Sequence, residues 1–311
     1  MVLEAAEALR GSVVRTPVLC ADALDTRAGR RVVAKAESLQ LTGSFKVRGA
    51  LNRIRTLTDA ERAAGLITVS AGNAALGAAY AARAYAAKLT VVMPENAVPE
   101  KLAAVTAYGG RVVSDGVTSA TIAFERMAQL QADEGLTLVH PFDDPYVIAG
   151  AATATLELLD DVPDLARLYV PCSGGGLLAG AIVAAQARQS TVQIVGIQPS
   201  GADGIVRSLS AGEVTAVPHV DTVADGLTAP KPGALNFDVI RRSGIEVRTV
   251  SDDQILSAMR LLITTLRVVV EPAAAAGLAG LLAAPESADI GPTGLLLSGS
   301  NVRWELLRDL L

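Results

Sequence analysis

Short apolar runs alternate with longer segments of helical periodicity along most of the chain. The runs are rich in Val, Ile and Leu and are bounded by Gly or Pro, a pattern typical of parallel strands buried on both faces. They predict strands at Arg31–Ala36, Leu66–Val69, Leu89–Met93, Arg111–Ser114, Leu168–Pro171, Gln193–Gln198, Ile245–Val250 and Gly294–Leu297. The periodic segments predict helices near Phe45–Thr56, Ala74–Ala87, Glu100–Tyr108, Thr118–Gly135, Pro145–Leu159, Leu177–Gln189 and Asp252–Val268. This alternation indicates an α/β, doubly wound fold class.

No segment predicts a membrane span, although the mean hydropathy is +0.39. A spanning helix needs about 18–20 apolar residues, and the best candidate, Ala273–Ala284, is shorter and contains two glycines. The N-terminal segment carries Glu4 and Glu7, which indicates an amphipathic helix and not a signal peptide. We therefore expect a cytoplasmic protein without membrane contact.

The composition excludes several classes of function. The 311 residues are 50% hydrophobic and 19% charged, with a net charge of -5, and no basic stripe with interleaved aromatics indicates nucleic-acid binding. Cys20, Cys172, His140 and His219 are isolated from one another along the chain. This spacing argues against a zinc site, a Ser-His-Asp triad and a disulfide framework.

One run places a lysine just inside a predicted helix start: Thr42-Gly43-Ser44-Phe45-Lys46. Free backbone N–H groups and the positive helix end lie near such a side chain, and with partial burial they disfavour its ammonium form. A neutral amine can attack an aldehyde and form a Schiff base. Taken alone, however, the run fits a solvated helix lysine better.

Two glycine turns each follow a predicted strand and precede a predicted helix: Ser70-Ala71-Gly72-Asn73 and Ser173-Gly174-Gly175-Gly176-Leu177. This layout can bind a carboxylate or a phosphate, because exposed N–H groups and the helix end face the anion. The second turn lacks a Walker A lysine and the spacing of a dinucleotide fingerprint, which favours a phosphate site without nucleotide machinery. Taken alone, each is also compatible with an ordinary strand-to-helix turn.

A fourth motif, Ser298-Gly299-Ser300-Asn301, follows the last predicted strand and alone would be a plain turn. In this order the four motifs resemble the serine/threonine dehydratase branch of the fold-type-II enzymes that use pyridoxal 5'-phosphate (PLP), a branch that also contains serine racemases. The resemblance covers nearly the whole chain. It also includes Arg15-Thr16-Pro17, Glu37–Gln40, Phe142–Pro145, Ala224–Gly226 and Glu271-Pro272.

The resemblance implies a tryptophan synthase β-like fold of two doubly wound domains with the PLP cleft between them. Residues 1–50 and 143–311 would form the large PLP-binding domain, and residues 51–142 a small mobile domain that closes over the substrate. It also implies a homodimer and, because no extension follows Leu311, no regulatory domain.

The resemblance assigns a role to each site residue. Lys46 would carry PLP as a Schiff base and act as the base at Cα. Phe45 would lie against the pyridine ring, Asn73 would bond the ring hydroxyl, and Ser298 would face the pyridine nitrogen. The glycine-turn amides of Ser173, Gly174, Gly175, Gly176 and Leu177 would hold the phosphate, with Gly226 and Glu271 as further cofactor contacts. The turn of Ser70, Ala71, Gly72 and Asn73 would bind the substrate carboxylate.

Ser298 bears on the type of reaction. A serine hydroxyl does not keep a pyridine nitrogen protonated as an aspartate would, so the ring is a weaker electron sink and prompt loss of a β-substituent is favoured. We expect Lys46 to remove the α-proton and the β-hydroxyl to leave with a proton from the cofactor phosphate. The products would be a 2-oxo acid and ammonia.

The chain departs from the branch at several positions. The usual Asn-His-Ala-Gln-Gly reads Asn73-Ala74-Ala75-Leu76-Gly77, so we expect a roomier site and an unusual β-substituted substrate. Ala71 stands where racemases carry a second catalytic serine, which argues against racemisation. Gln198 and Gly204 stand where racemase-like members bind a divalent cation through acidic residues, so we expect no metal.

Three functions remain open at this point. The first is an ammonia-lyase, or dehydratase, acting on serine, threonine or a related β-hydroxy amino acid. The second is another PLP reaction on the same scaffold, such as β-replacement, racemisation or epimerisation, in a specialised biosynthetic pathway. The third is a non-catalytic homologue that binds PLP or an amino acid as a sensor.

Overall fold

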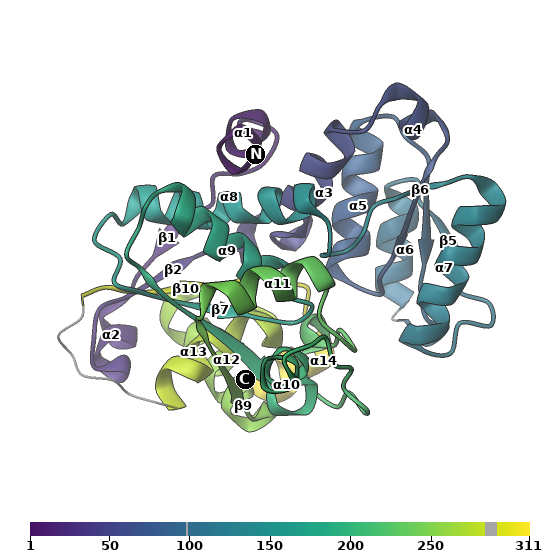
Figure 1. Ribbon diagram of the computed structural model, residues 1–311. Helices are drawn as coiled ribbons and strands as arrows, with labels where there is room; N and C mark the ends of the chain where they lie inside the picture. The colour runs from purple at the N-terminus through teal and green to yellow at the C-terminus, as the bar shows by residue number, and fades with distance from the viewer. Residues whose placement is uncertain (98, 284–290) are drawn as a thin grey trace.

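The computed structural model describes residues 1–97, 99–283 and 291–311. Within these residues the chain forms two β-sheets, each covered by helices on both faces (Figure 1). The smaller sheet and helices α4 to α7 lie to one side of the larger body, at the upper right of Figure 1.

The larger sheet has six strands. Their spatial order is β1 (Val18–Leu19), β2 (Val32–Lys35), β10 (Thr293–Leu296), β7 (Arg167–Pro171), β8 (Gln193–Pro199) and β9 (Glu246–Val250). Strand β1 is antiparallel to β2, and every other neighbouring pair is parallel. The smaller sheet is parallel throughout, in the order β5 (Arg111–Val113), β4 (Leu89–Val92), β3 (Leu66–Val69) and β6 (Thr137–Leu138).

The helices of the first half of the chain are α1 (Val2–Leu9), α2 (Asp22–Ala28), α3 (Lys46–Arg55), α4 (Asp59–Ala63), α5 (Asn73–Ala84), α6 (Pro99–Ala107) and α7 (Ala120–Glu134). Those of the second half are α8 (Pro145–Asp161), α9 (Gly176–Ala187), α10 (Gly204–Ala211), α11 (Ala234–Ser243), α12 (Asp252–Leu266), α13 (Pro272–Ala283) and α14 (Trp304–Leu310). No helix of the described ranges is long and apolar enough to cross a bilayer.

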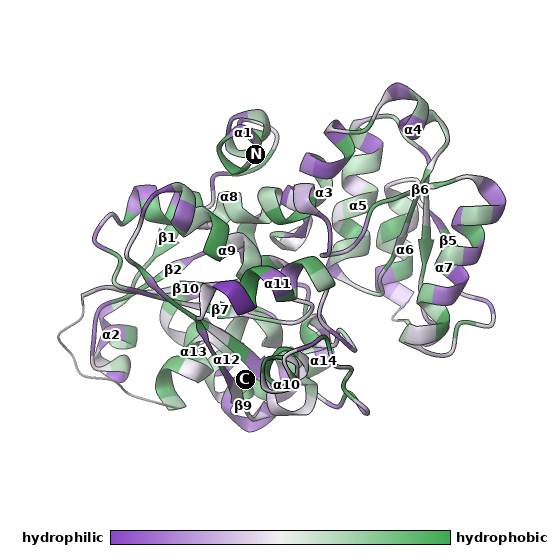
Figure 2. Cartoon of the chain, in the orientation of Figure 1, coloured by the Kyte–Doolittle hydropathy of each residue, from purple (hydrophilic) through white to green (hydrophobic). Residues whose placement is uncertain are grey.

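The two faces of the larger sheet bury alternate residues of each strand, as the period of two requires. Tyr169 on β7 faces a core shared with α2, α12 and α13, whereas its neighbours Leu168 and Val170 face a core shared with α8 and α9. In the smaller sheet, Leu66 faces α3 and α5, and Ile67 faces α7. Figure 2 shows the hydrophobic residues along the strands and the hydrophilic ones on outer helices such as α4.

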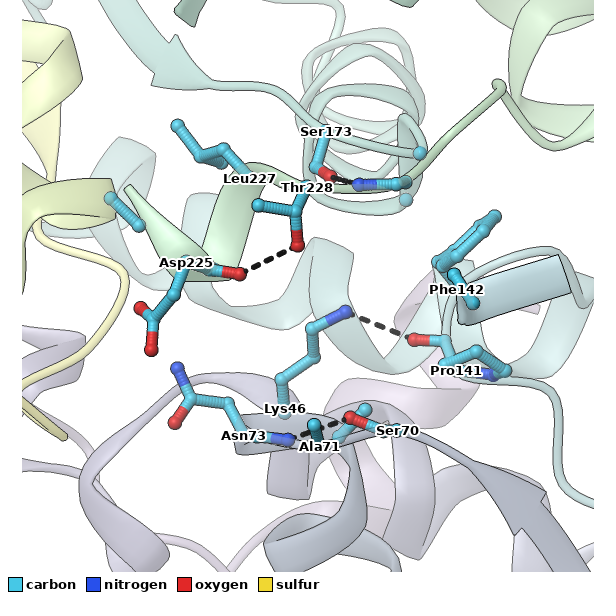
Figure 3. Close-up of a pocket in the computed structure, with 18 of the residues that line it drawn as sticks. Lys46, Ser70, Ala71, Asn73, Pro141, Phe142, Ser173, Asp225, Leu227 and Thr228 are labelled. Carbon is cyan, nitrogen blue, oxygen red and sulfur yellow. Dashed lines mark hydrogen bonds between the residues drawn. The ribbon is translucent and has the colours of Figure 1, made fainter. Parts of the chain in front are cut away.

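Helix α3 lies between the two bodies and begins at Lys46, whose side chain points towards the carbonyl of Pro141 (Figure 3). Glycines allow its neighbours to approach its backbone. A Cβ atom on Gly77 of α5 would lie 2.9 Å from the Lys46 carbonyl carbon, and one on Gly150 of α8 would lie 2.5 Å from the Arg48 oxygen. Both distances are shorter than van der Waals contact, so only glycine permits these two crossings.

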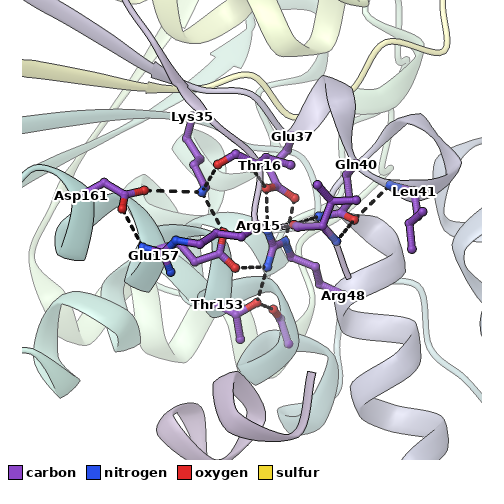
Figure 4. Close-up of polar contacts among 12 residues, drawn as sticks. Arg15, Thr16, Lys35, Glu37, Gln40, Leu41, Arg48, Thr153, Glu157 and Asp161 are labelled. Atoms are coloured by element: carbon purple, nitrogen blue, oxygen red, sulfur yellow. Dashed lines mark hydrogen bonds and ion pairs between the residues drawn. The ribbon is translucent and has the colours of Figure 1, made fainter. Parts of the chain in front are cut away.

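A buried ion network fixes the same helix (Figure 4). The Arg48 guanidinium donates two hydrogen bonds to the Glu37 carboxylate, at 2.7 and 2.8 Å, and two to Glu157, at 2.7 and 3.0 Å. Lys35 Nζ lies 2.7 Å from Glu157 and donates to the Thr16 carbonyl. Buried charges are stable only when paired and hydrogen-bonded, so this network holds α3 against β2 and α8.

All eight predicted strands and all seven predicted helices are present, with ends that differ by up to three residues. The differences at helix ends have a backbone cause. Helix α12 ends before Arg267, which adopts the left-handed conformation with φ 58°, and Ala86 and Gln189 just beyond α5 and α9 also have positive φ. A residue in this conformation ends an α-helix.

Two strands and several helices lie outside the prediction. Strands β1 and β6 have two residues each, too few for a hydrophobic alternation. Helix α13 is apolar on every side and therefore lacks an amphipathic period. It occupies most of Ala273–Ala284, the apolar run that was the best candidate for a membrane span. The last residue of that run, Ala284, lies outside the described residues.

We expect Arg48→Met to lower the free energy of unfolding by about 3–5 kcal/mol, because it leaves the Glu37 carboxylate buried without its cation. Urea denaturation monitored by circular dichroism measures this loss. The control is Arg188→Met, which removes an exposed ion pair with Asp160 and should cost less than about 1 kcal/mol. Equal losses in the two variants would contradict a structural role for the buried network.

Candidate active site

A pocket of about 330 Å³ lies between the two sheets, at the carboxyl ends of β3, β7 and β10. This is where open parallel sheets usually bind ligands. Each residue to which the sequence assigned a site role lines it: Phe45, Lys46, Ser70, Ala71, Gly72, Asn73, Ser173, Gly174, Gly175, Gly176, Leu177, Gly226, Glu271 and Ser298. Six segments far apart in the sequence therefore meet at one place.

Lys46 is the first residue of α3, and its side chain extends across the pocket (Figure 3). Its Nζ donates a 3.0 Å hydrogen bond to the Pro141 carbonyl and lies 5.3 Å from the centroid of the Phe45 ring. Burial lowers the pKa of Lys46 to about 8, although the Glu271 carboxylate acts in the opposite direction. The amine is thus partly neutral near physiological pH, which a nucleophile or base requires.

The glycine turn after β7 is shaped by close contacts on both sides. A Cβ atom on Gly174 would lie 2.6 Å from the Phe142 ring, and Gly175 has φ +98°. The first N–H groups of α9 follow directly and have no acceptor within their own helix. The turn therefore presents backbone donors at a helix N-terminus, a surface suited to an anion.

The connection at Phe142 and Asp143 fixes this turn to α11. The Asp143 carboxylate accepts hydrogen bonds from the N–H groups of Ala234, Leu235 and Asn236, at 2.9–3.2 Å. The Asn236 amide in turn donates to the carbonyls of Phe142 and Gly174. Ser173 adds a hydroxyl that accepts from the N–H of Ala229 at 3.0 Å, which leaves the hydroxyl hydrogen available to a ligand.

A chain of side-chain hydrogen bonds crosses the floor of the pocket. The Asn73 Nδ2 donates to Glu271 Oε1 at 2.7 Å, and its Oδ1 accepts from Asn301 Nδ2, also at 2.7 Å. Gly72 and not Asn73 is the N-cap of α5, so the Asn73 side chain serves the pocket and not the helix end. Burial raises the pKa of Glu271 to about 7, against the hydrogen bond from Asn73.

The turn after β3 offers fewer free amides than its sequence suggested. The Ser70 N–H donates to the Val92 carbonyl at 3.1 Å, and the Gly72 N–H donates to the Ser70 hydroxyl at 3.1 Å. The N–H groups of Asn73 and Ala74, in the first turn of α5, have no acceptor within the helix. The donors at this side of the pocket are therefore centred on the start of α5.

The expectation for Leu76 is wrong. Its side chain is buried in the core between α3 and α5 and does not line the pocket. Ala74, two residues earlier, does line it. Two residues correspond to about 200° around an α-helix, so Leu76 lies on the side of α5 away from Ala74 and packs into the core.

The sequence did not single out Lys101, Asp225 or the start of α7 as parts of the site. Lys101 on α6 reaches across the pocket to Asp225 on the opposite side, and its Nζ lies 2.6 Å from the carboxylate. Ala120, Ala123 and Phe124 of α7 complete the wall. Asp225 lies in the segment Ala224–Gly226, which the resemblance includes without giving Asp225 a role, whereas Lys101 and the start of α7 lie in no glycine turn or recognisable motif.

No group of three or more His, Cys, Asp or Glu side chains in the described ranges could hold a metal ion. The Gln198 side chain is held by the backbone of α10, because its Oε1 accepts hydrogen bonds from the N–H groups of Ile205 and Val206.

Comparison with known proteins agrees with this geometry. The family model described as "Pyridoxal-phosphate dependent enzyme" matches residues 9–299. The L-threo-3-hydroxyaspartate ammonia-lyase of Saccharomyces cerevisiae is 36% identical over 302 residues, which cover 97% of this chain and 92% of that protein. The L-threonine ammonia-lyase of Geobacter sulfurreducens is 38% identical over 97% of this chain and 75% of that protein.

A solved structure shares the fold. Maize serine racemase superposes with a TM-score of 0.94 and 35% identity, over 99% of this chain and 94% of that one. Family match, identity and superposition all span nearly the whole chain. The chain therefore belongs to the PLP-dependent enzymes of fold type II, in the branch of the serine and threonine dehydratases.

Proposed function

We propose that the chain catalyses β-elimination from a serine- or threonine-like β-hydroxy amino acid, giving a 2-oxo acid and ammonia. The observation that carries the proposal is that Lys46, the glycine turn before α9 and Ser298 line one pocket. The relatives named as ammonia-lyases support the same reaction type. In the reaction the Cα–H and Cβ–O bonds break, a Cα=Cβ bond forms and water leaves. The released enamine then tautomerises and is hydrolysed.

The cofactor is PLP, as the family implies, and the residues of the pocket fit it. Gly174 and Gly175 form a cradle of backbone in which a Cβ atom would collide with the Phe142 ring or with Asn236, and the free amides at the start of α9 beside it suit a phosphate. A lysine with a lowered pKa faces that cradle across the pocket. When bound, PLP supplies the electron sink that makes the substrate α-proton acidic.

Lys46 would hold the cofactor, and its neutral Nζ would remove the substrate α-proton. Its pKa of about 8 supports both tasks, because a base works best when its pKa lies near the working pH. The Pro141 carbonyl, at 3.0 Å, orients the amine. The free N–H groups of Asn73 and Ala74 bind the substrate carboxylate, together with the Ser70 hydroxyl, whose hydrogen is not used by the bond from the Gly72 N–H.

Asn73 and Ser298 contact the cofactor ring in this proposal. The second Nδ2 hydrogen of Asn73 remains available to the ring hydroxyl, since the first is held by Glu271. Ser298 is nearly buried, and its carbonyl accepts from the Phe45 N–H at 3.1 Å. Its hydroxyl can bond the pyridine nitrogen without protonating it, which favours elimination.

Racemisation is the second candidate, because one close structural neighbour is a serine racemase. It requires a proton donor on the face of the substrate opposite Lys46. By the resemblance, racemases carry that donor, a serine, at the position of Ala71, which lines the pocket and has no ionisable hydrogen. Elimination is therefore the reaction that these side chains favour.

We also infer a domain motion, an assembly and a location. Residues 51–142 form the small mobile domain, which closes over the substrate, and residues 1–50 and 143–311 form the large one. The protein is a cytoplasmic homodimer. The resemblance to the dehydratase branch supports these statements, and the unpaired Cys20 and Cys172 suit a reducing compartment.

Lys46→Ala should abolish the covalent adduct that borohydride reduction leaves on the protein loaded with PLP, because the other amine among the described pocket residues, that of Lys101, is held by Asp225. Mass spectrometry of tryptic peptides measures the adduct. The exposed Lys88 provides the control, and Lys88→Ala should keep full labelling at Lys46. An adduct of unchanged yield in the Lys46 variant would rule out the assignment.

The rate at which the apoprotein captures PLP should rise about tenfold between pH 7 and pH 9. The reason is that the pKa of Lys46 is lowered to about 8, so the neutral amine grows from about a tenth to about nine tenths over this range. Stopped-flow absorbance of the forming adduct measures the rate. A rate that keeps rising with the same slope beyond pH 10 would indicate an ordinary lysine pKa instead.

With a β-hydroxy amino acid that turns over, ammonia and a 2-oxo acid should form in equal amounts, because elimination releases both from one enamine. Coupled dehydrogenase assays measure the two products, and chiral chromatography follows the remaining substrate. We expect no D-enantiomer above the level formed without enzyme. Accumulation of that enantiomer at a rate comparable to 2-oxo acid formation would favour the racemase instead.

A further inference from the structure

One side of the pocket is apolar and consists mainly of alanines. Ala71 and Ala74 at the start of α5, and Ala120, Ala123 and Phe124 at the start of α7, form this side, which we call the apolar wall. It contains the turn proposed to bind the substrate carboxylate. A substrate held there would therefore direct its own side chain along the apolar wall.

The charges in the pocket do not suit a second carboxylate on the substrate. Among the described residues that line it, Lys46 and Lys101 are the cationic side chains, and Asp225 and Glu271 are the acidic ones. Lys101 is already paired with Asp225 at 2.6 Å, and Lys46 serves the reaction. A second carboxylate on the substrate would lose its hydration on contact with the alanines. It would gain no unpaired cation in exchange, so its binding is unfavourable.

The apolar wall also leaves room for more than a methyl group. Four of its five members are alanines, and Ala120, the first residue of α7, is exposed to solvent. The wall thus has members at the carboxylate turn and a member at the surface, and Phe124 is its one large side chain. Burying apolar area is favourable in proportion to the area removed from water, so a larger apolar substituent gains contacts that threonine cannot make.

We propose that the substrate is a β-hydroxy amino acid whose β-carbon carries an apolar group larger than methyl, branched aliphatic or aromatic, and that dicarboxylic substrates are disfavoured. This inference rests on the proposed β-elimination and names its substrate class. It differs from the substrate printed in the name of the yeast relative, 3-hydroxyaspartate. The bonds that break and form are those of the elimination already described.

The first experiment compares four L-threo substrates with the same leaving group on the PLP-loaded enzyme: threonine, 3-hydroxyleucine, 3-phenylserine and 3-hydroxyaspartate. We expect kcat/KM for at least one of the two larger apolar substrates to exceed that for threonine by at least about tenfold, the scale set by a hydrophobic pocket. We expect 3-hydroxyaspartate to be the poorest of the four. Any ranking with threonine or 3-hydroxyaspartate first overturns the inference.

The second experiment separates the substrate class from the reaction itself. Calorimetry on the PLP-loaded enzyme measures the binding of L-leucine, L-phenylalanine, L-alanine and L-aspartate, none of which has a β-leaving group. The apolar wall predicts that leucine or phenylalanine binds at least about tenfold more tightly than alanine, and that aspartate binds most weakly. If no substrate is eliminated but this order holds, the proposed function fails and the assignment of the wall stands. If aspartate binds most tightly of the four, the assignment of the apolar wall to the substrate side chain is overturned as well.

A matched pair of variants tests the position of the wall. Ala120→Arg places a cation on it, and Thr121→Arg places the same cation on the next residue of α7, which is exposed and does not line the pocket. We expect Ala120→Arg to raise kcat/KM for 3-hydroxyaspartate relative to 3-phenylserine by at least about tenfold, and Thr121→Arg to change that ratio less than about threefold. Equal ratios in the two variants would show that the substrate side chain lies elsewhere.

Discussion

The contact of helix α3 with its two neighbouring helices at backbone distance is the constraint on which the site depends. Gly77 and Gly150 allow α5 and α8 to touch the backbone on either side of Lys46 and Arg48. The buried carboxylates of Glu37 and Glu157 then fix the helix through the Arg48 guanidinium (Figure 4). Because Lys46 is the first residue of that helix, the position of its backbone is set by packing outside the pocket, and the Pro141 carbonyl then orients its amine.

Inside the pocket, burial brings two ionisable groups close to neutrality. It lowers the pKa of Lys46 to about 8 and raises that of Glu271 to about 7. Asn73 connects the carboxyl group of Glu271 to Asn301 and so to the segment that carries Ser298. Glu271, Asn73 and Asn301 thus form one connected set of side chains, which acts on Lys46 only through the charge of Glu271.

Much of the fold follows from local patterns. Most of the predicted strands are buried Val, Ile and Leu runs, whose alternation places their side chains on two faces, whereas the edge strands β5 and β9 are partly exposed. The strand Leu66–Val69 has the predicted ends. The pattern did not predict strands β1 and β6, because two residues are too few to show an alternation of hydrophobic and polar positions. It did not predict helix α13, because a helix that is apolar on every side has no hydrophobic period. Left-handed residues such as Arg267 shortened helices that the hydrophobic pattern alone would extend.

The sequence by itself determined the family, the lysine and the glycine turns, because each is a local motif whose backbone geometry is dictated by its own residues. Only the tertiary structure decided that Lys101 and Asp225 meet across the pocket, that Leu76 turns away from it, and that the start of α7 completes its wall. These residues come from different helices and loops, and they meet only because two separately folded sheets are held against α3. Local periodicity carries no information about such a meeting, since it depends on long-range packing.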